Sequence, residues 1–384
     1  MRTKKNILLS ILLATVLAAL PVDGGDTKTK IQAPTRITVT DMAGRQVFVT
    51  VPVNRVVLWD RDLPTFAAVA GENFLQKIAG WELSVSRHTL SVHDTYFKFW
   101  EKYPEIGAIP DVGNHWQGTF NVEKVISLKP DVFIMPLWLL IDKNPVVTED
   151  IARMEAAGIP TVFIDCWKNP FESIMSSTLL LGTLLGKEKR AQEIVDFYQK
   201  RVPEIFSRLQ KIKKPKPKVY VEGSTNGPSE YGGTCGNVAW GVMVVKAGGV
   251  NISEGIIKRF GQISPEYLLK TNPDVIIIAG PEPPSSKRPG NQPNREESRR
   301  LLKAFTKRPG WNNLNAVKHG RVYGILDSSY LIHSIYNFAV IQGFAKWFYP
   351  DDFRDLDPER DRREFNNKFL PFISNQLWMI GIQD

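Results

Sequence analysis

Aromatic side chains in predicted loops are the first candidates in this chain for contact with a ligand. Ten tryptophans occur in 384 residues, and many of them directly follow short apolar runs. The loop residues singled out in this way are Trp59 with Arg61, Trp81, Trp116, Trp138, Trp167, Tyr231, Trp240, Tyr330 and His333. Flat, rigid rings with polar edges suit the capture of a large ligand with flat faces, and Arg61 could neutralise negative charge on it. A tryptophan is also a common core residue, so packing is the competing interpretation for each of them.

Signals for catalysis or for a resident metal are missing from the sequence. It contains no phosphate-binding loop, no Gly-x-Gly-x-x-Gly after a strand, no nucleophile elbow and no His-Glu-x-x-His. His88, His93, His115 and His319 form no compact ligand set, and neither cysteine has a partner at zinc-ligand spacing. Cys166 and Cys235 could pair or remain separate buried thiols. We therefore expect a binding protein, with no catalytic residue, cofactor or metal site of its own.

Strand and helix patterns alternate on both sides of one long helical stretch. A hairpin is predicted at Ile37–Thr40 and Val47–Val51. Buried strands are predicted at 55–59, 77–80, 131–136 and 161–164, then at 219–222, 274–279 and 322–326, and helices at 64–71, 122–128 and 147–157. This alternation is typical of parallel sheets covered by helices, which is the α/β class. Residues 170–213 keep helical periodicity without a strand signal and predict one long helix.

A short unit occurs once in each half of the chain. Residues 121–134 match residues 264–277: an N-cap residue opens a short helix, and Pro-Asp-Val then begins a buried strand. Glu123 and Glu266 stand at the same place in the two copies, seven residues before the proline. Two lobes built from one unit imply a two-fold-like arrangement with a cleft between them.

These features resemble the binding proteins of ABC importers for iron–siderophores, haem and cobalamin. The resemblance covers roughly residues 35–384, and the segments that carry it are 37–45, 52–57, 109–113, 121–134, 247–252, 264–277 and 311–323. It implies two parallel-sheet lobes, residues 35–169 and 216–384, joined by a single long helix at 170–213, with the ligand cleft between the lobes. The chain departs from a minimal member of the family in longer segments at 226–241 and 281–300, and in an extended tail at 348–384.

The resemblance also implies a function and its partners. The ligand would be a small-molecule metal chelate, first of all a ferric siderophore, and the partner would be the permease of an ABC importer. Cobalamin is the alternative ligand, because Trp116-Gln117-Gly118 resembles the loop of cobalamin-binding members. Haem, a nickel or cobalt chelate, and a chelate-processing enzyme come after it. In the family, glutamates matching Glu123 and Glu266 engage permease arginines, whereas a simple helix-start carboxylate is the competing interpretation.

The remaining expectations concern state and location. The net charge of +9 is scattered and accompanies no nucleic-acid motif, so we expect no nucleic-acid partner, and we expect a monomer. Basic residues before the apolar run Ile7–Leu20 predict a signal peptide, residues 1–25, with the mature chain starting between Ala19 and Asp26. An uncleaved anchor is the alternative. No cysteine lies near the end of the run, so we expect a periplasmic protein without a lipid anchor.

Overall fold

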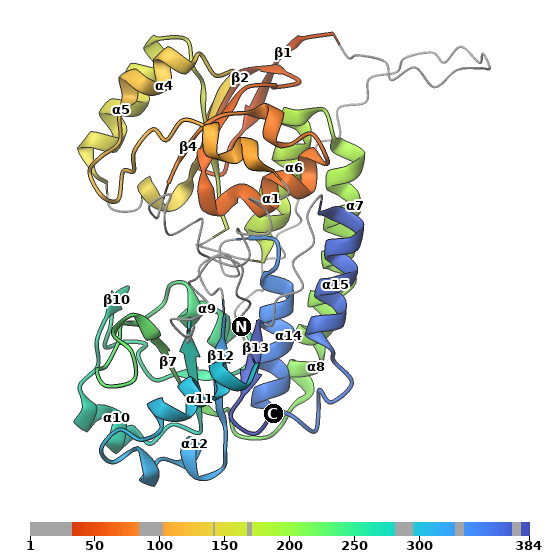
Figure 1. Cartoon of the computed structure of the whole chain (residues 1–384). Coiled ribbons are helices and arrows are strands. Elements are labelled where there is room, and N and C mark those ends of the chain that lie inside the picture. The colour runs from red at the N-terminus through yellow and green to blue at the C-terminus, as the bar shows by residue number, and fades with distance from the viewer. Residues whose placement is uncertain are drawn as a thin grey trace, which may run out of the picture. The chain divides into compact units, whose positions relative to one another are not determined.

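The computed structural model of this chain describes residues 33–83, 103–140, 143–166, 171–280, 295–326, 334–370 and 378–384. One compact unit spans Pro34–Asp384 and contains two parallel sheets with their helices (Figure 1). The predicted α/β class is therefore confirmed. Three of the predicted ligand contacts, Trp167, Tyr330 and His333, lie outside the described residues, as does the predicted signal peptide. In the described part of the chain, no helix combines the length and the apolar character that a membrane crossing requires.

The predicted hairpin opens the compact unit. Strand β1 (Thr35–Thr40) pairs antiparallel with β2 (Gln46–Val51). At the turn, the Asp41 carboxylate accepts hydrogen bonds from two backbone amides and from the Arg45 guanidinium. Arg45 also donates to the carbonyl oxygen of Thr161, so the turn is attached to a strand of the first sheet.

The first sheet has four parallel strands in the order β4-β3-β5-β6. They are β3 (Val56–Trp59), β4 (Ile78–Glu82), β5 (Val132–Pro136) and β6 (Thr161–Ile164). Almost every strand residue is buried, as expected for a parallel sheet covered on both faces. The helices of this lobe are α1 (Leu63–Ala70), α4 (Val122–Leu128) and α5 (Pro145–Ala156). Because β4 and β5 lie on opposite sides of β3, the strand order reverses between β3 and β5.

The second sheet repeats this order and adds one antiparallel edge strand. Its order is β13-β12-β11-β7-β9, and only β13 runs antiparallel to its neighbour. The strands are β7 (Lys218–Gly223), β9 (Val250–Asn251), β11 (Val275–Ala279), β12 (Val322–Ile325) and β13 (Met379–Gly381). The helices beside it are α9 (Trp240–Lys246), α10 (Pro265–Thr271), α11 (Arg295–Phe305) and α12 (Asn315–Lys318), and β8 (Thr234–Cys235) pairs with β10 (Phe260–Gly261). Here the strand order reverses between β7 and β11.

The repeated unit has the same structure in both lobes. Helices α4 and α10 each have seven residues and begin with a side-chain cap, from Asn121 and Ser264 respectively. The aspartate of Pro-Asp-Val then bonds to the neighbouring strand. Asp131 accepts from two backbone amides that lead into β3, and Asp274 accepts from the amide of Lys218 at the start of β7. The predicted repeat is confirmed, and its aspartates tie each strand to the next one in the sheet.

The connecting segment is helical, but the prediction of one continuous helix was wrong. It forms α6 (Glu172–Leu185), α7 (Glu188–Gln199) and α8 (Val202–Lys211). Gly186 ends α6 in the left-handed conformation, with a φ of 62°. Helices α6 and α7 then pack so closely that a side chain at Gly182 would collide with Ala191. The periodicity continues through these breaks because all three helices bury an apolar face.

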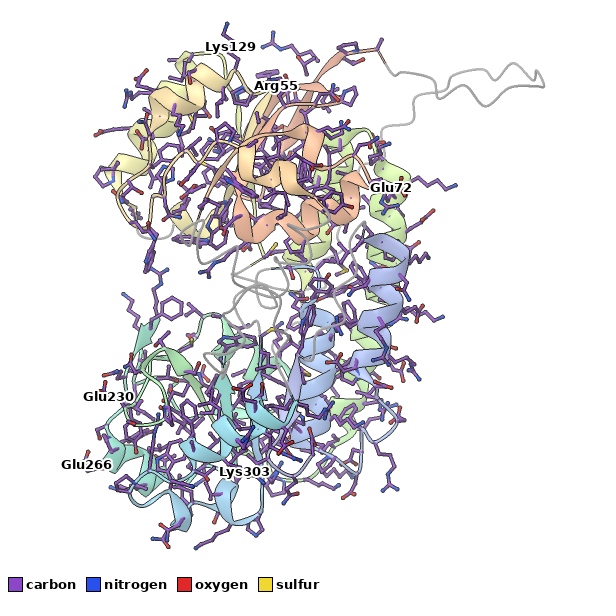
Figure 2. All side chains as sticks on the ribbon, viewed as in Figure 1. Arg55, Glu72, Lys129, Glu230, Glu266 and Lys303 are labelled. Atoms are coloured by element: carbon purple, nitrogen blue, oxygen red, sulfur yellow. The ribbon has the colours of Figure 1, made fainter. Side chains whose placement is uncertain are left out.

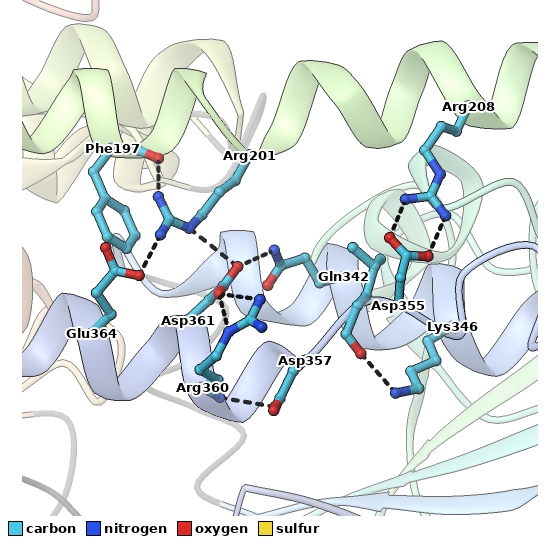
Figure 3. Close-up of polar contacts among 11 residues, drawn as sticks. Phe197, Arg201, Arg208, Gln342, Lys346, Asp355, Asp357, Arg360, Asp361 and Glu364 are labelled. Carbon is cyan, nitrogen blue, oxygen red and sulfur yellow. Dashed lines mark hydrogen bonds and ion pairs between the residues drawn. The ribbon is translucent and has the colours of Figure 1, made fainter.

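The tail of the chain lies along the connecting helices. Helices α14 (Asn337–Phe348) and α15 (Pro358–Phe369) pack beside α7 and α8 (Figure 3). Arg201 donates to Asp361 at 3.1 Å and to Glu364 at 2.8 Å, and Arg208 donates to both carboxylate oxygens of Asp355. These contacts come from carboxylates that lie about 150 residues later in the chain, so they join segments that are distant in sequence.

A further arginine connects the tail to the first lobe. Arg190 of α7 donates to the carbonyl oxygen of Ala68 in α1 at 2.6 Å and to that of Phe369 in α15 at 2.8 Å. Below it, the ring of Phe197 contacts the rings of Phe365 and Phe369 at centroid distances of 5.3 and 5.8 Å. The tail thus reaches the connector through both polar and apolar contacts.

Replacing Arg201 should weaken the whole unit. We expect Arg201→Ala to lower the free energy of unfolding by about 2 kcal/mol, because charged hydrogen bonds to largely buried Asp361 and stacking on Phe197 are lost. Urea unfolding followed by circular dichroism measures this. Arg354→Ala is the matched control, since its ion pair with Asp351 is fully at the surface and should contribute little. Equal effects of the two variants would show that the tail does not brace the connector.

Candidate ligand-binding site

Three tryptophans form a continuous row at the carboxyl ends of β3 and β5. Trp59 is the last residue of β3, and Trp138 lies in the short helix η4 (Leu137–Leu140) that follows β5. Their ring centroids are 5.6 Å apart in an edge-to-face arrangement, and Trp138 meets Trp116 in the same way at 5.7 Å. In doubly wound sheets, ligands bind where the strand order reverses, which here is between β3 and β5. The row of Trp59, Trp138 and Trp116, called the aromatic row below, stands at this point.

The aromatic row runs from the core to the surface. Trp59 and Trp138 are buried, with 5% and 9% of their surface exposed, whereas Trp116 is 68% exposed. Trp116 therefore offers a free ring surface, and the other two support it from behind. Arg61 completes the group, because its guanidinium lies 5.3 Å from the centre of the Trp59 ring. The structure thus brings together four of the residues predicted to contact a ligand.

The loop that carries Trp116 is held by side-chain hydrogen bonds. Asn114 accepts from the amide of Gln117 and donates to the carbonyl of Leu83, just after β4. The backbone amide of His115 donates to the carboxylate of Glu82, 2.8 Å away, and the His115 ring lies 3.2 Å from both oxygens of that carboxylate. The loop is therefore fixed to the end of β4, the strand beside β3. The sequence showed only that His115 belongs to no compact set of metal ligands, and Glu82 was not identified from it.

Buried carboxylates gather at the same edge of the sheet. Asp60 and Asp62 follow β3, Glu82 ends β4 and Asp165 follows β6, and each of these residues is at most 3% exposed. Burial raises the pKa of Asp62 well above its usual value, and the nearby Asp60, Glu82 and Asp165 raise it further, while Arg61 opposes them. In the described ranges, no three His, Cys, Asp or Glu side chains are arranged to hold a metal ion. The acidic group was not predicted, although acids directly after strand patterns are visible in the sequence.

Two of the predicted contact residues are core residues in the structure. Trp81 is 2% exposed and packs with Leu58 in a core cluster separate from the one that holds Trp59 and Trp138. Trp240 is 8% exposed and packs against Phe344. In the structure, therefore, both tryptophans are packing residues of the core. Trp81 lies within β4, where neighbouring residues point to opposite faces of the sheet, and Trp240 is the first residue of helix α9. Position after a strand pattern was therefore a poor guide to both.

In the second lobe, Tyr231 belongs to a loop held by a buried ion pair. Glu222, in β7, accepts two hydrogen bonds from Arg308 at 2.7 and 2.8 Å, and both side chains are almost fully buried. Arg308 also donates to the carbonyls of Pro228 and Gly227, and its guanidinium lies 4.6 Å from the centre of the Tyr231 ring. The phenol oxygen of Tyr231 accepts from the Trp311 indole. Sequence reasoning identified Tyr231 and missed the ion pair, whose partners are 86 residues apart.

The two glutamates of the repeated unit stand at matching helix starts but differ in their partners. Glu123 is exposed and is ion-paired with Arg153 of α5. Figure 2 shows Glu266 on the outside of the second lobe. Hydrogen bonds to its own backbone amide and to Ser264 hold the pKa of Glu266 below its usual value, so this carboxylate stays charged to lower pH. Both carboxylates lie at the surface, as a docking role requires.

The cysteines do not form a disulfide. Cys166 and Cys235 are free thiols and both are buried. Burial raises the pKa of Cys166 well above its usual value and that of Cys235 to about 11. Neither thiol is therefore activated as a nucleophile, because the thiolate is the reactive form.

Comparison with known proteins agrees with this geometry. Residues 86–328 match the family described as periplasmic binding protein. The structure of a TroA-like periplasmic binding protein, FepB from Veillonella parvula, is similar over 90% of this chain and 99% of that protein, with a TM-score of 0.79 and 38% sequence identity. The chain therefore belongs to the periplasmic binding protein family, and the resemblance inferred from its sequence is confirmed.

Two sequence relatives describe the class more closely. The ABC transporter substrate-binding lipoprotein YvrC of Bacillus subtilis, itself uncharacterized, is 26% identical over 368 residues, which cover 92% of this chain and all of that protein. The molybdate-binding protein MolA of Haemophilus influenzae is 21% identical over 358 residues, 86% of this chain and 90% of that protein. The chain is thus a substrate-binding protein of the kind that serves ABC transporters. Because YvrC is a lipoprotein, the absence of a lipid anchor here stays a prediction.

Truncating the exposed end of the aromatic row and truncating its buried middle should have very different effects on stability. We expect Trp116→Ala to change the free energy of unfolding by less than about 0.5 kcal/mol, because its ring is mostly in solvent. Trp138→Ala should cost about 3–5 kcal/mol, since it leaves a cavity between Trp59 and Trp116. Urea unfolding followed by circular dichroism compares the two. Similar losses would show that Trp116 is a packing residue.

Proposed function

We propose that this chain captures a bulky metal chelate, most specifically a ferric siderophore, and delivers it to an ABC importer. The aromatic row carries the proposal. It stands at the point of strand reversal where ligands of doubly wound sheets bind, and it ends in a tryptophan ring that is free to cover a flat face. Arg61 beside Trp59 adds the positive charge that an anionic chelate requires.

The shape and chemistry of the row favour a chelate over a bare ion. A small oxyanion or a hydrated metal needs several convergent polar groups and gains little from an exposed indole. A chelate presents flat or macrocyclic organic surface, and burying one face of a tryptophan against such a surface contributes both apolar burial and ring contact. The ligand would lie between the two lobes, with the Tyr231 loop of the second lobe opposite the aromatic row.

Cobalamin or haem is the second candidate. The observation that favours it is the loop of Trp116, Gln117 and Gly118, in which the indole and an exposed amide side chain stand next to one another. A macrocycle has a large flat face for the ring and amide or carboxylate groups at its edge for hydrogen bonds. This alternative uses the same residues and differs only in the ligand that fills the site.

Delivery to a permease is supported by the repeated unit. Glu123 and Glu266 begin the equivalent helices α4 and α10, so a permease with matching basic residues could engage both lobes together. Opposite charges across such an interface raise the association rate and fix the orientation of the partner. Neither glutamate belongs to the aromatic row, so docking and capture would use different surfaces.

A ligand panel tests the capture. Tryptophan fluorescence should be quenched by a ferric catecholate chelate, and the panel includes haemin, cyanocobalamin and molybdate as alternatives. Trp116→Ala should weaken binding of the active compound by more than about 1 kcal/mol, about fivefold, the scale of a ring contact. Phe48→Ala is the control, because Phe48 is 61% exposed but lies in the hairpin. Tight binding of molybdate with no effect of Trp116→Ala would overturn the chelate proposal.

An uptake assay tests the docking. Glu123→Ala and Glu266→Ala should sharply reduce uptake in cells, and the purified variants should keep the chelate affinity of the unchanged protein. Association with the permease should also weaken as the salt concentration rises. Glu188→Ala controls for helix-start effects, because Glu188 is an exposed acid in the first turn of α7. Normal uptake by the double variant of Glu123 and Glu266 would mean that the two acids only stabilise their helices.

A further inference from the structure

His115, the residue before Trp116, is held through both its main chain and its side chain. The His115 side chain is 1% exposed, and its Nδ1 lies 3.2 Å from both carboxylate oxygens of Glu82. The backbone amide of His115 donates to the same carboxylate at 2.8 Å. One glutamate thus holds both the main chain and the side chain of the residue that precedes Trp116.

The other edge and one face of the imidazole are also occupied. Nε2 lies 3.6 Å from Oδ2 of Asp150 in α5, whose side chain is 11% exposed. The ring stacks on Phe120 with a centroid distance of 3.7 Å, and Phe120 stacks on Phe133 of β5. The imidazole is therefore held by the end of β4 and, through Phe120, by strand β5, whereas its Nε2 has no hydrogen-bond partner among the described residues.

The rest of the loop closes around this anchor. The amide of Gly118 donates to the carbonyl of His115, and the amide of Asn114 donates to the hydroxyl of Thr119. Gly113 has a φ of +81°, and a side chain there would collide with the backbone of Thr119. The backbone is thus constrained on both sides of Trp116. This fixes the position of the indole, which packs edge-to-face with Trp138.

We propose that His115, clamped by Glu82 and stacked on Phe120, is the positioning residue that holds Trp116 in place for ligand capture. It does not contact the ligand and acts through the indole beside it. A ring surface that is already in place binds without the loss of loop and side-chain freedom that a mobile tryptophan would incur on binding. The ligand part of this inference rests on the proposed function, whereas the positioning itself can be measured in the free protein.

Fluorine NMR of the ligand-free protein labelled with 5-fluorotryptophan tests the positioning. The Trp116 signal is assigned by its disappearance in Trp116→Phe. In the unchanged protein it should be a single line, displaced from the solvent value by the Trp138 ring. His115→Ala should move this line to the solvent value or broaden it, while the signals of the buried tryptophans stay in place. His319→Ala is the control, because His319 is an exposed histidine whose ring bonds to the carbonyl of Asn315.

Two conservative variants separate the clamp from simple packing. The amide nitrogen of asparagine occupies the place of Nδ1, so His115→Asn keeps the contact with Glu82, whereas His115→Gln places its amide nitrogen toward Asp150. We expect His115→Asn to retain the Trp116 line and His115→Gln to lose it. If His115→Ala does not fold, the comparison of His115→Asn with His115→Gln still tests whether the contact with Glu82 positions Trp116. A Trp116 line that is unchanged in a folded His115→Ala, or that is retained only in His115→Gln, overturns the proposal.

The ligand step uses cyanocobalamin and a ferric catecholate as probes. Whichever of the two quenches the unchanged protein should bind His115→Ala several-fold more weakly and His115→Asn nearly as well. Unchanged binding by His115→Ala, together with a displaced Trp116 line, would refute the role in capture. If neither probe binds the unchanged protein, the proposed ligand class is wrong, while the NMR result stands by itself and decides the positioning.

Discussion

Hydrogen bonding between β3 and β5 is the constraint on which the site depends. Strand β4 comes between them in the chain but lies on the far side of β3. Chain segments that leave the carboxyl ends of β3 and β5 therefore turn toward opposite faces of the sheet and leave room between them. Trp59 is the last residue of β3, and Trp138 lies in the short helix that directly follows β5. Pairing of β7 with β11 repeats the arrangement in the second lobe, where Glu222 and Arg308 hold the loop that carries Tyr231.

Polar contacts extend from the ligand-facing loop to the predicted docking surface of the first lobe. His115 lies between Glu82 and Asp150, the other oxygen of Asp150 is 3.7 Å from Arg153, and Arg153 pairs with Glu123. His115, Glu82 and Asp150 are buried, so removing one of them would leave a buried polar group without its contact. The outer pair is exposed and contributes little. The loop is thus firmly held, while Glu123 is free to exchange its partner.

The tail makes the connector stiffer than three separate helices would be. Arg190 of α7, Arg201 between α7 and α8, and Arg208 of α8 all bond to residues of the tail. Figure 3 shows the contacts of Arg201 and Arg208, and the Phe197 ring packs against that of Phe365. Bending the connector would break several of these contacts together. With a stiff connector, we expect the relative orientation of the two lobes to change only modestly on ligand binding. The extended tail, a departure from the family pattern, therefore has a structural place in this chain.

Local patterns in the sequence determined the elements of the fold, because helix periodicity, caps and Pro-Asp-Val turns depend on residues a few positions apart. They predicted the hairpin, the buried strands, the repeated unit and the surface glutamates Glu123 and Glu266. Tertiary structure alone decided that α6, α7 and α8 are separate helices, and that Trp81 and Trp240 are core while Trp116 is exposed. It also decided the pairing of Glu222 with Arg308 and of Glu82 with His115. Burial and ion pairing depend on which distant segments meet, and that is set by the order of strands in the sheets.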